Sequence, residues 1–159
     1  MSIGIRPARE QDAPAILALV RSERMRPTGL DWRRFHLAVE TGAIIGAVQL
    51  RPKGPELASL VVRADRRCRG IGAALILSRL AGVTAPVFLV APRELSGFYR
   101  RRGFAPCQPS AAPCPVAIDW ALGQSLGTFL SLAKRSRPRR MIVMVRARAA
   151  SPAPRAPLP

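Results

Sequence analysis

Hydrophobic positions near the start of the chain change from a two-residue period to a helical one. Ile3 and Ile5 alternate with polar or small neighbours, which predicts a short strand. Asp12 followed by Pro14 is typical of a helix start, with Asp12 as the N-cap residue. The apolar positions over residues 16–20 recur at helical spacing, so they predict a helix after this start.

The middle of the chain predicts a hairpin followed by a strand, a loop and a helix. Residues 36–40 and 43–50 flank the Thr41-Gly42 turn, a pattern that predicts a β-hairpin. Residues 57–62 are strand-like and lead into a basic, glycine-containing loop. Helical spacing resumes over residues 73–80.

A second strand after this helix would complete a βαβ crossover. Residues 87–90 form a short apolar run of the buried-strand kind, and Gly82 suits the left-handed position at the end of the preceding helix. A βαβ unit favours parallel pairing of its strands and helices packed on a mixed sheet. A short helix over residues 97–102 should follow, with Gly103 as its left-handed stop.

The remainder of the chain predicts one more helix, one more strand and a tail. After a proline-rich connection, apolar residues from Ile118 to Ala133 recur at helical spacing, and residues 141–145 read as a strand. Residues 147–159 contain only Ala, Arg, Pro, Ser and Leu, which predicts a disordered tail. We therefore expect one folded domain over residues 1–146 and a tail over residues 147–159.

Composition agrees with a folded, cytoplasmic domain. The chain has 159 residues, 48% hydrophobic and 22% charged, as in globular domains. Its three cysteines have no C-x-x-C spacing and His36 is the sole histidine, so we expect no metal site and a reduced compartment. The start lacks a signal-peptide pattern and no apolar run is long enough to span a bilayer, so we expect no membrane partner.

The formal net charge of +17 has two interpretations. Such a charge can attract nucleic acid through its phosphates. Lys53 and Lys134 are the only lysines, however, and an excess that is almost all arginine also fits a bias in codon composition. Aromatic residues make up only 5% of the chain and the tail has none for base stacking, so a nucleic acid partner is the weaker reading.

The loop between residues 67 and 72 has the features of a pyrophosphate site. Successive backbone N–H groups that lead into a helix form an anion-binding concavity, which the helix dipole strengthens. Gly70 and Gly72 let the backbone approach phosphates without a Cβ in the way, and Arg67 and Arg69 add positive charge. The alternative is a solvated basic turn between a strand and a helix.

Two motifs resemble the GNAT superfamily of N-acetyltransferases. LVVRADRRCRGIG at residues 60–72 is similar to its Gln/Arg-x-x-Gly-x-Gly/Ala loop, and FYRRRGF at residues 98–104 to its Phe-Tyr-x-x-x-Gly-Phe motif. The resemblance extends from Ile3 to Val145 and implies an α/β fold with a mixed, mostly antiparallel sheet, a parallel βαβ core and helices on both faces. It also implies that acetyl-CoA is the cofactor, bound by Leu60, Val61, Val62, Arg67, Cys68, Arg69, Gly70, Ile71, Gly72 and Ala73.

The resemblance assigns catalytic roles to a side chain and to main-chain groups. Tyr99, the only tyrosine, would protonate the CoA thiolate, although packing beside Phe98 and Phe104 is an alternative role. A backbone N–H within residues 60–62 would polarise the acetyl carbonyl. Cys68 stands where many members of the family have glycine, and we expect it to be a spectator.

The general base and the acceptor are less defined by sequence. Glu56 is the acidic residue nearest to the strand that enters the site, so it is the candidate base; it could equally be an exposed turn residue, with water relaying the proton. Residues 115–145 loosely resemble small bacterial GNAT proteins associated with arsenic resistance and with N-acetylglutamate-type synthesis. This likeness implies an amino acid or another small amine as acceptor.

Two further expectations concern the acceptor and a competing function. An arginine such as Arg33, Arg34 or Arg93 could hold a carboxylate of the acceptor. The enzyme would act as a monomer or homodimer. A degenerate GNAT domain that serves as a basic binding module for nucleic acid or another acidic partner is the alternative function.

Overall fold

The computed structural model of the protein describes residues 3–23, 25, 27–52, 54–122 and 140–147. One sheet of seven strands runs through the described residues in the order β1-β2-β3-β4-β5-β7-β6. Its strands are β1 (Ile3–Pro7), β2 (Phe35–Glu40), β3 (Ala43–Arg51), β4 (Glu56–Val62), β5 (Val87–Pro92), β6 (Ala105–Cys107) and β7 (Met141–Arg146). The labelled helices are α1 (Ala13–Ser22), α2 (Ile71–Leu80) and α3 (Ser96–Arg100).

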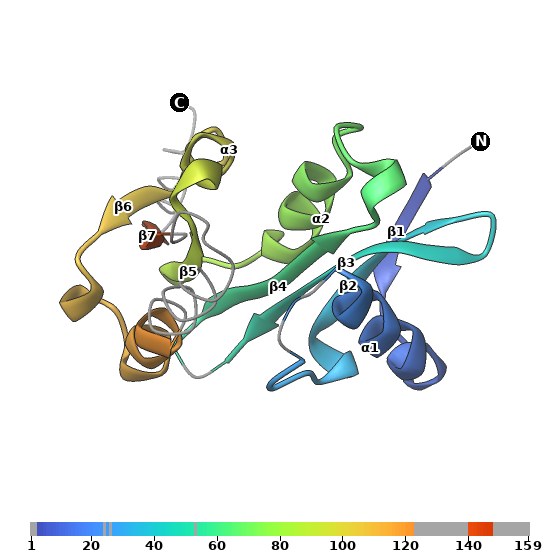
Figure 1. The fold of residues 1–159 in the computed structure, drawn as a ribbon, viewed down its shortest axis with the longest axis horizontal. Helices are drawn as coiled ribbons and strands as arrows, with labels where there is room; N and C mark the ends of the chain where they lie inside the picture. The colour runs from blue at the N-terminus through green and yellow to red at the C-terminus, as the bar shows by residue number, and fades with distance from the viewer. Residues whose placement is uncertain (1–2, 24, 26, 53, 123–139, 148–159) are drawn as a thin grey trace, which may run out of the picture.

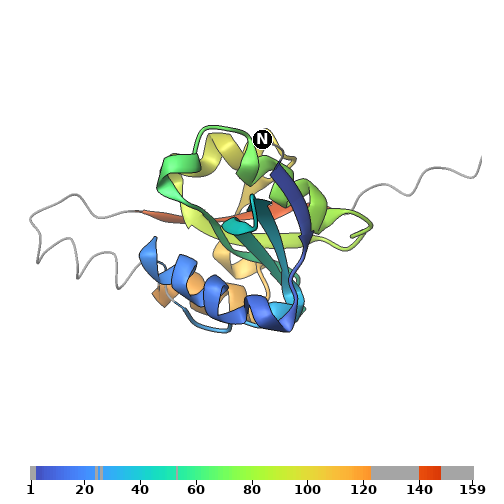
Figure 2. The same ribbon diagram turned by 90° about the vertical axis from the view of Figure 1, so that its right-hand side faces the viewer.

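Helices α1 and α2 cover opposite faces of the sheet (Figures 1 and 2). Beneath α1, residues such as Ile16, Val20 and Phe35 form one buried apolar cluster. The larger cluster lies beneath α2 and includes Leu75 and Leu89. Both helices bury an apolar stripe against strands that are apolar on each face, so the sheet is the shared middle layer of the domain.

Strands β4 and β5 pair over only a short distance. Glu56 is aligned with Phe88 in the parallel pair, and Phe88 N–H donates to the Pro55 carbonyl at 2.8 Å. No other β4–β5 register is found among the described residues, although both strands continue beyond it. The downstream ends of β4 and β5 are therefore free to line a cavity between them.

The fold class predicted from sequence is confirmed. The sheet is mixed and mostly antiparallel, with β4–β5 as the parallel pair across α2. The β2–β3 hairpin turns at residues 41–42, and Gly82 and Gly103 adopt left-handed φ values of 75° and 81° as expected. Helix α2 begins at Ile71, two residues before the predicted start, and the buried Ile71 side chain extends the apolar stripe by one turn ahead of Leu75.

Asp12 occupies the expected N-cap position of α1, but its carboxylate does not cap the helix. Its two oxygens accept hydrogen bonds from the Arg6 guanidinium at 2.7 and 2.9 Å, and one also accepts from the Arg9 N–H. The bond from Arg6 holds the pKa of Asp12 below its ordinary value. The aspartate thus ties β1 to the start of α1.

The last predicted elements are only partly described. Residues 114–122 are helical and residues 141–146 form β7, as expected. The continuation of the predicted helix through residues 123–133 lies outside the described residues. So does the predicted tail from residue 148 onward, and the proposed domain boundary stays a prediction.

Candidate active site

A cavity of about 880 Å³ lies where the ends of β4 and β5 meet α2 and α3. This volume is within the usual range of sites for small molecules and cofactors. The β4 residues Leu60, Val61 and Val62 line it on one side, and Pro92 at the end of β5 on another. Phe98 and Tyr99 of α3 also contribute to its wall. We call this space the cofactor cavity.

The N-terminus of α2 opens into the cofactor cavity. Gly70, Ile71, Gly72 and Ala73 all line it, and Gly70 precedes the helix with φ 75°, a left-handed conformation that favours glycine. No side chain caps the helix, so the N–H groups of its first turn are available to an anion. These four residues, all predicted from the loop motif, therefore lie together at one wall of the cavity, and their role in binding phosphate stays a prediction.

Gly70 and Gly72 contribute for different reasons. A Cβ added at Gly70 would meet open space, so its backbone angle explains the glycine. At Gly72, a Cβ would lie 3.4 Å from the Phe98 ring, an ordinary contact distance. The fold would therefore accommodate a small side chain there. Gly72 lines the cavity, where the absence of a side chain would let a ligand approach the backbone closely.

Cys68 also adopts a left-handed conformation, with φ 62°, although it is not glycine. Its side chain is exposed and the residue lines the cofactor cavity. A left-handed angle favours glycine, which accounts for the glycine that many GNAT proteins have at this position.

The arginines of the loop are largely paired with acidic side chains. The Arg67 guanidinium donates from Nη2 to the Glu23 carboxylate and from Nε to the Val62 carbonyl at 3.1 Å. Arg66 donates to Glu40 at 2.7 Å and to Asp65 at 2.9 Å. These pairs reduce the net positive charge that the loop presents to a ligand.

The structure separates the two arginines that the motif grouped together. Arg67 lines the cofactor cavity, whereas Arg69 is exposed and does not line it. Arg66 and Glu23 do line it, and sequence reasoning missed both. Glu23 precedes the first hairpin of the sheet in the chain, and its other oxygen accepts from the Ala64 N–H at 3.0 Å. No local motif could have placed it there.

Tyr99 combines a packing role with access to the cavity. Its ring makes edge-to-face contacts with Phe98 and Phe104, at centroid distances of 5.0 and 6.1 Å. Burial raises the pKa of Tyr99 to about 12, and Arg102 lowers it to a smaller extent. The phenol is therefore protonated throughout the physiological range, as a proton donor must be.

Glu56 lies outside the cofactor cavity as its lining residues define it. It is only 4% exposed, and its carboxylate accepts from Arg51 Nη1 at 3.1 Å. The same nitrogen donates to Asp119 at 2.6 Å, and Nη2 donates to the Thr28 carbonyl at 2.8 Å. We call these four residues the Arg51 cluster. The expectation of a possible exposed turn residue is wrong, because Glu56 is buried.

Glu56 retains a property expected of a base. Burial is the largest influence on its pKa and raises it above the ordinary value for glutamate, with a smaller rise from Asp119 and opposition from Arg51. A raised pKa brings a carboxyl group closer to the pH at which it can exchange protons. Its assignment as the base stays a prediction.

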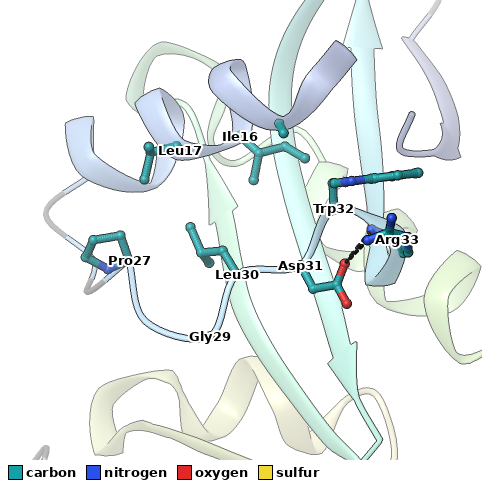
Figure 3. A pocket seen from close by; sticks show the side chains of 9 residues that line it. Ile16, Leu17, Pro27, Gly29, Leu30, Asp31, Trp32 and Arg33 are labelled. Carbon is teal, nitrogen blue, oxygen red and sulfur yellow. Dashed lines mark hydrogen bonds and ion pairs between the residues drawn. The ribbon is translucent and has the colours of Figure 1, made fainter. Parts of the chain in front are cut away.

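A second cavity, of about 560 Å³, lies between α1 and the segment that precedes β2 (Figure 3). Ile16, Leu17 and Leu30 form its apolar wall. Arg33, one of the arginines suggested for a carboxylate, lies at its edge with its guanidinium 4.6 Å from the Trp32 ring centroid. The other two suggested arginines, at positions 34 and 93, line neither cavity.

One protein-family model matches the part of the sequence that forms this cavity. The model described as an acetyltransferase (GNAT) domain matches residues 31–106, which contain the hairpin, the βαβ unit and α3. Over those residues, just under half of the chain, the sequence is similar to the GNAT acetyltransferase domain. The glycine loop and Tyr99 both fall within the matched range, so the GNAT resemblance inferred from them is confirmed.

Solved structures extend the similarity beyond the matched residues. One is an N-acetylglutamate synthase from Neisseria gonorrhoeae, complexed with coenzyme A and N-acetyl-glutamate, with a TM-score of 0.71 and 21% identity. The alignment covers 94% of this chain and 36% of the synthase chain. Rv2747 from Mycobacterium tuberculosis, in complex with CoA and NLQ, has a TM-score of 0.68, 20% identity, and coverage of 92% and 99% respectively. At these identities the similarity establishes the fold.

A third solved structure shares the fold at lower sequence identity. Naa50 from Arabidopsis thaliana, in complex with the bisubstrate analogue CoA-Ac-MVNAL, has a TM-score of 0.61 and 16% identity, and covers 92% of this chain and 99% of its own. The chain spans about a third of the length of the Neisseria synthase. No curated protein matches the sequence significantly.

Membrane spans and metal-binding groups are absent from the part of the chain that the structure describes. Within the described ranges, no helix combines the length and apolar character that a membrane span needs. The same ranges contain no group of three or more His, Cys, Asp or Glu residues with a metal-binding arrangement.

Proposed function

We propose that the protein transfers an acetyl group from acetyl-CoA to the primary amine of a small molecule or amino acid. It would act in the cytoplasm, as a monomer or homodimer, by direct attack in a ternary complex. One observation carries the proposal: a single cavity has the uncapped N-terminus of α2 along one wall and the buried phenol of Tyr99 along another. The first suits a pyrophosphate and the second suits a thiolate leaving group.

The cofactor would bind through main-chain groups more than through side chains. The N–H groups of Ile71, Gly72 and Ala73 would face the pyrophosphate, and Arg67 at the cavity wall would add a positive charge partly balanced by Glu23. Leu60 to Val62 would hold the acyl end of the molecule along β4. Acetyl-CoA supplies a thioester, whose carbonyl carbon is open to attack by an amine.

In the proposed reaction the amine nitrogen forms a bond with the acetyl carbonyl carbon. A main-chain N–H within residues 60–62 stabilises the oxygen of the tetrahedral intermediate. The carbon–sulfur bond then breaks, and Tyr99 donates its proton to the departing sulfur. Because Glu56 lies outside the cavity, the amine would lose its proton to Glu56 through water, and return of that proton to Tyr99 through solvent would restore both groups.

The acceptor class rests on a sequence likeness and on the solved complexes. The Neisseria synthase is complexed with N-acetyl-glutamate, which has an acylated amino group. Arg33 beside the second cavity is the suggested carboxylate partner that remains exposed at a cavity edge. We therefore include amino acids among the acceptors, without restricting the proposal to one of them.

The test combines cofactor binding with turnover. Acetyl-CoA at about 100 times its dissociation constant should stabilise the full chain by about 2.7 kcal/mol, measured as a shift in unfolding temperature, with ATP at equal concentration as the polyanion control. A panel of amino acids and small amines is then scanned for acetyl-CoA-dependent release of free thiol. An equal shift with ATP and no thiol release would reject the proposal and favour the basic binding module.

A further inference from the structure

Strand β4 contains a bulge next to the residues that line the cofactor cavity. Ala47 of β3 is aligned with Val61, but Gln49 is aligned with Ala58. One residue of β3, Val48, therefore faces two residues of β4, Ser59 and Leu60. An extra residue of this kind bends a strand and changes the direction of the groups that follow it.

The bulge exchanges the two faces of β4. Leu57 packs in the cluster beneath α2, whereas Val61, four residues later, packs in the cluster beneath α1. In a regular strand these two side chains would share a face, because side chains alternate with a period of two. The orientation of the main chain at the cavity thus depends on the bulge.

Ser59 has the left-handed backbone conformation that the bulge requires. Its φ is 52°, which is uncommon for a residue other than glycine. Gln49, on the neighbouring strand, donates a hydrogen bond from its side-chain nitrogen to the Ser59 hydroxyl at 3.0 Å. This bond links β3 to the strained residue itself.

Gln49 is poorly explained by stability alone. Its side chain is completely buried, and its amide oxygen has no hydrogen-bond partner within the part of the chain that the structure describes. A buried, unpartnered carbonyl is unfavourable, and an apolar side chain of similar length would avoid that cost. The feature that an apolar side chain could not reproduce is the bond to Ser59.

We propose that Gln49 is a positioning residue for acetyl transfer, because it holds Ser59 and thereby aims the main chain of residues 60–62 at the acetyl carbonyl. This inference rests on the proposed function. Gln49 itself would touch neither acetyl-CoA nor the acceptor, since it does not line the cofactor cavity. Its influence passes through the bulge to the N–H group that stabilises the oxygen of the intermediate.

Two single variants and their combination test the bond. Gln49→Met keeps the length of the side chain and removes its donor, and Ser59→Ala removes the acceptor. We expect each to lower kcat by about 10- to 100-fold, below the effect of deleting an oxyanion donor outright, with KM for acetyl-CoA little changed. The double variant should lose no more than the more impaired single variant, because both changes break the same hydrogen bond.

A control variant and a spectroscopic measurement distinguish loss of positioning from a general loss of stability. Ile45→Val, a buried change on β3 outside the cavity, should lower the unfolding temperature without lowering kcat. The infrared band of a ¹³C-labelled acetyl carbonyl, in the complex with unreacted acetyl-CoA, should move to higher frequency in Gln49→Met as its hydrogen bond weakens.

The outcomes distinguish this inference from the proposed function. An unchanged carbonyl band and unchanged kcat in Gln49→Met would overturn the positioning role, as would strictly additive losses in the double variant. Binding of acetyl-CoA without any turnover by the unmodified chain would reject the proposed function, while the carbonyl band would still test the role of Gln49. Absence of acetyl-CoA binding would overturn both.

Discussion

The cofactor cavity and the Arg51 cluster are built from different parts of the peptide. The cavity takes most of its lining from residues 60–73 and 92–102, and the surface proposed to bind an anion is main chain. The Arg51 cluster joins side chains of β3, β4 and the helical segment 114–122 to a carbonyl of the segment before β2. A main-chain site is most sensitive to added bulk, and a side-chain cluster is most sensitive to a lost charge.

The largest expected effect concerns Tyr99, the proposed proton donor at the wall of the cofactor cavity. Tyr99→Phe should lower kcat by about 10²–10⁴-fold, because the departing sulfur loses its proton donor. Binding of acetyl-CoA should change little, since the ring and its contacts with Phe98 and Phe104 are retained. Steady-state kinetics and calorimetric binding measure the two quantities.

The pH profile of the unmodified enzyme gives a second reading of Tyr99. With a pKa of about 12, its phenol does not lose its proton below about pH 10, so it should produce no fall in kcat there. A fall with a midpoint near pH 9 that disappears in Tyr99→Phe would contradict the raised pKa.

The next largest effect is on stability and belongs to the Arg51 cluster. Arg51→Gln should destabilise the fold by about 3 kcal/mol at neutral pH, because it leaves the buried Glu56 carboxylate without its cation. Asp119→Asn, at a more exposed position of the same cluster, should cost less than about 1 kcal/mol. Urea unfolding monitored by circular dichroism measures both.

The pH dependence of this loss has a defined sign. The pKa of Glu56 is already raised in the folded protein, and removal of Arg51 would raise it further. A raised pKa favours folding below the unfolded-state value and loses that benefit as pH rises through the folded-state value. Arg51→Gln should therefore be less destabilising below about pH 4 than at neutral pH. A larger loss in acid than at neutral pH would contradict this account.

The third largest effect should be on acetyl-CoA affinity, when a side chain is added at Gly72 in the cofactor cavity. Gly72→Glu should weaken acetyl-CoA binding by about 100-fold, because it places a carboxylate where the phosphates meet the first turn of α2. The fold should persist, as a Cβ at this position makes only an ordinary contact with Phe98. Calorimetric titration of acetyl-CoA measures the affinity.

The matched control adds the same charge elsewhere. Gly4 is exposed on β1, and a Cβ there meets nothing within 4 Å. Gly4→Glu should leave affinity within about threefold of the unmodified chain, which is less than about 1 kcal/mol. Equal losses in the two variants would show that net charge, rather than the α2 site, controls binding.

The smallest expected effect concerns the acidic residue at the edge of the cofactor cavity. Glu23→Gln should tighten CoA binding about three- to fivefold at low salt, because it removes a negative charge near the phosphates while an amide oxygen can still accept from the Ala64 N–H. The gain should shrink as salt screens the charge. The control Glu10→Gln changes an exposed residue outside the cavity and should leave the affinity for CoA unchanged. Weaker CoA binding by Glu23→Gln would show that Glu23 acts by orienting Arg67 rather than through its charge.

The sequence predicted the elements and the cofactor loop because their signals are local. Alternation and helical spacing located the β2–β3 hairpin and the βαβ unit, and Gly82 and Gly103 marked left-handed positions after two helices. The GNAT resemblance relied on these contiguous residues and was confirmed. Backbone geometry is encoded over a few residues, so a single sequence can display it.

The tertiary structure decided which side chains meet. Glu23 reaches Arg67 and Asp119 reaches Arg51 across tens of intervening residues, and no local pattern predicts such pairs. The arginines of the loop looked alike in sequence, yet Arg67 lines the cavity and Arg69 does not. The bulge at Ser59 was equally hidden, because it depends on how β3 and β4 align rather than on the composition of either strand.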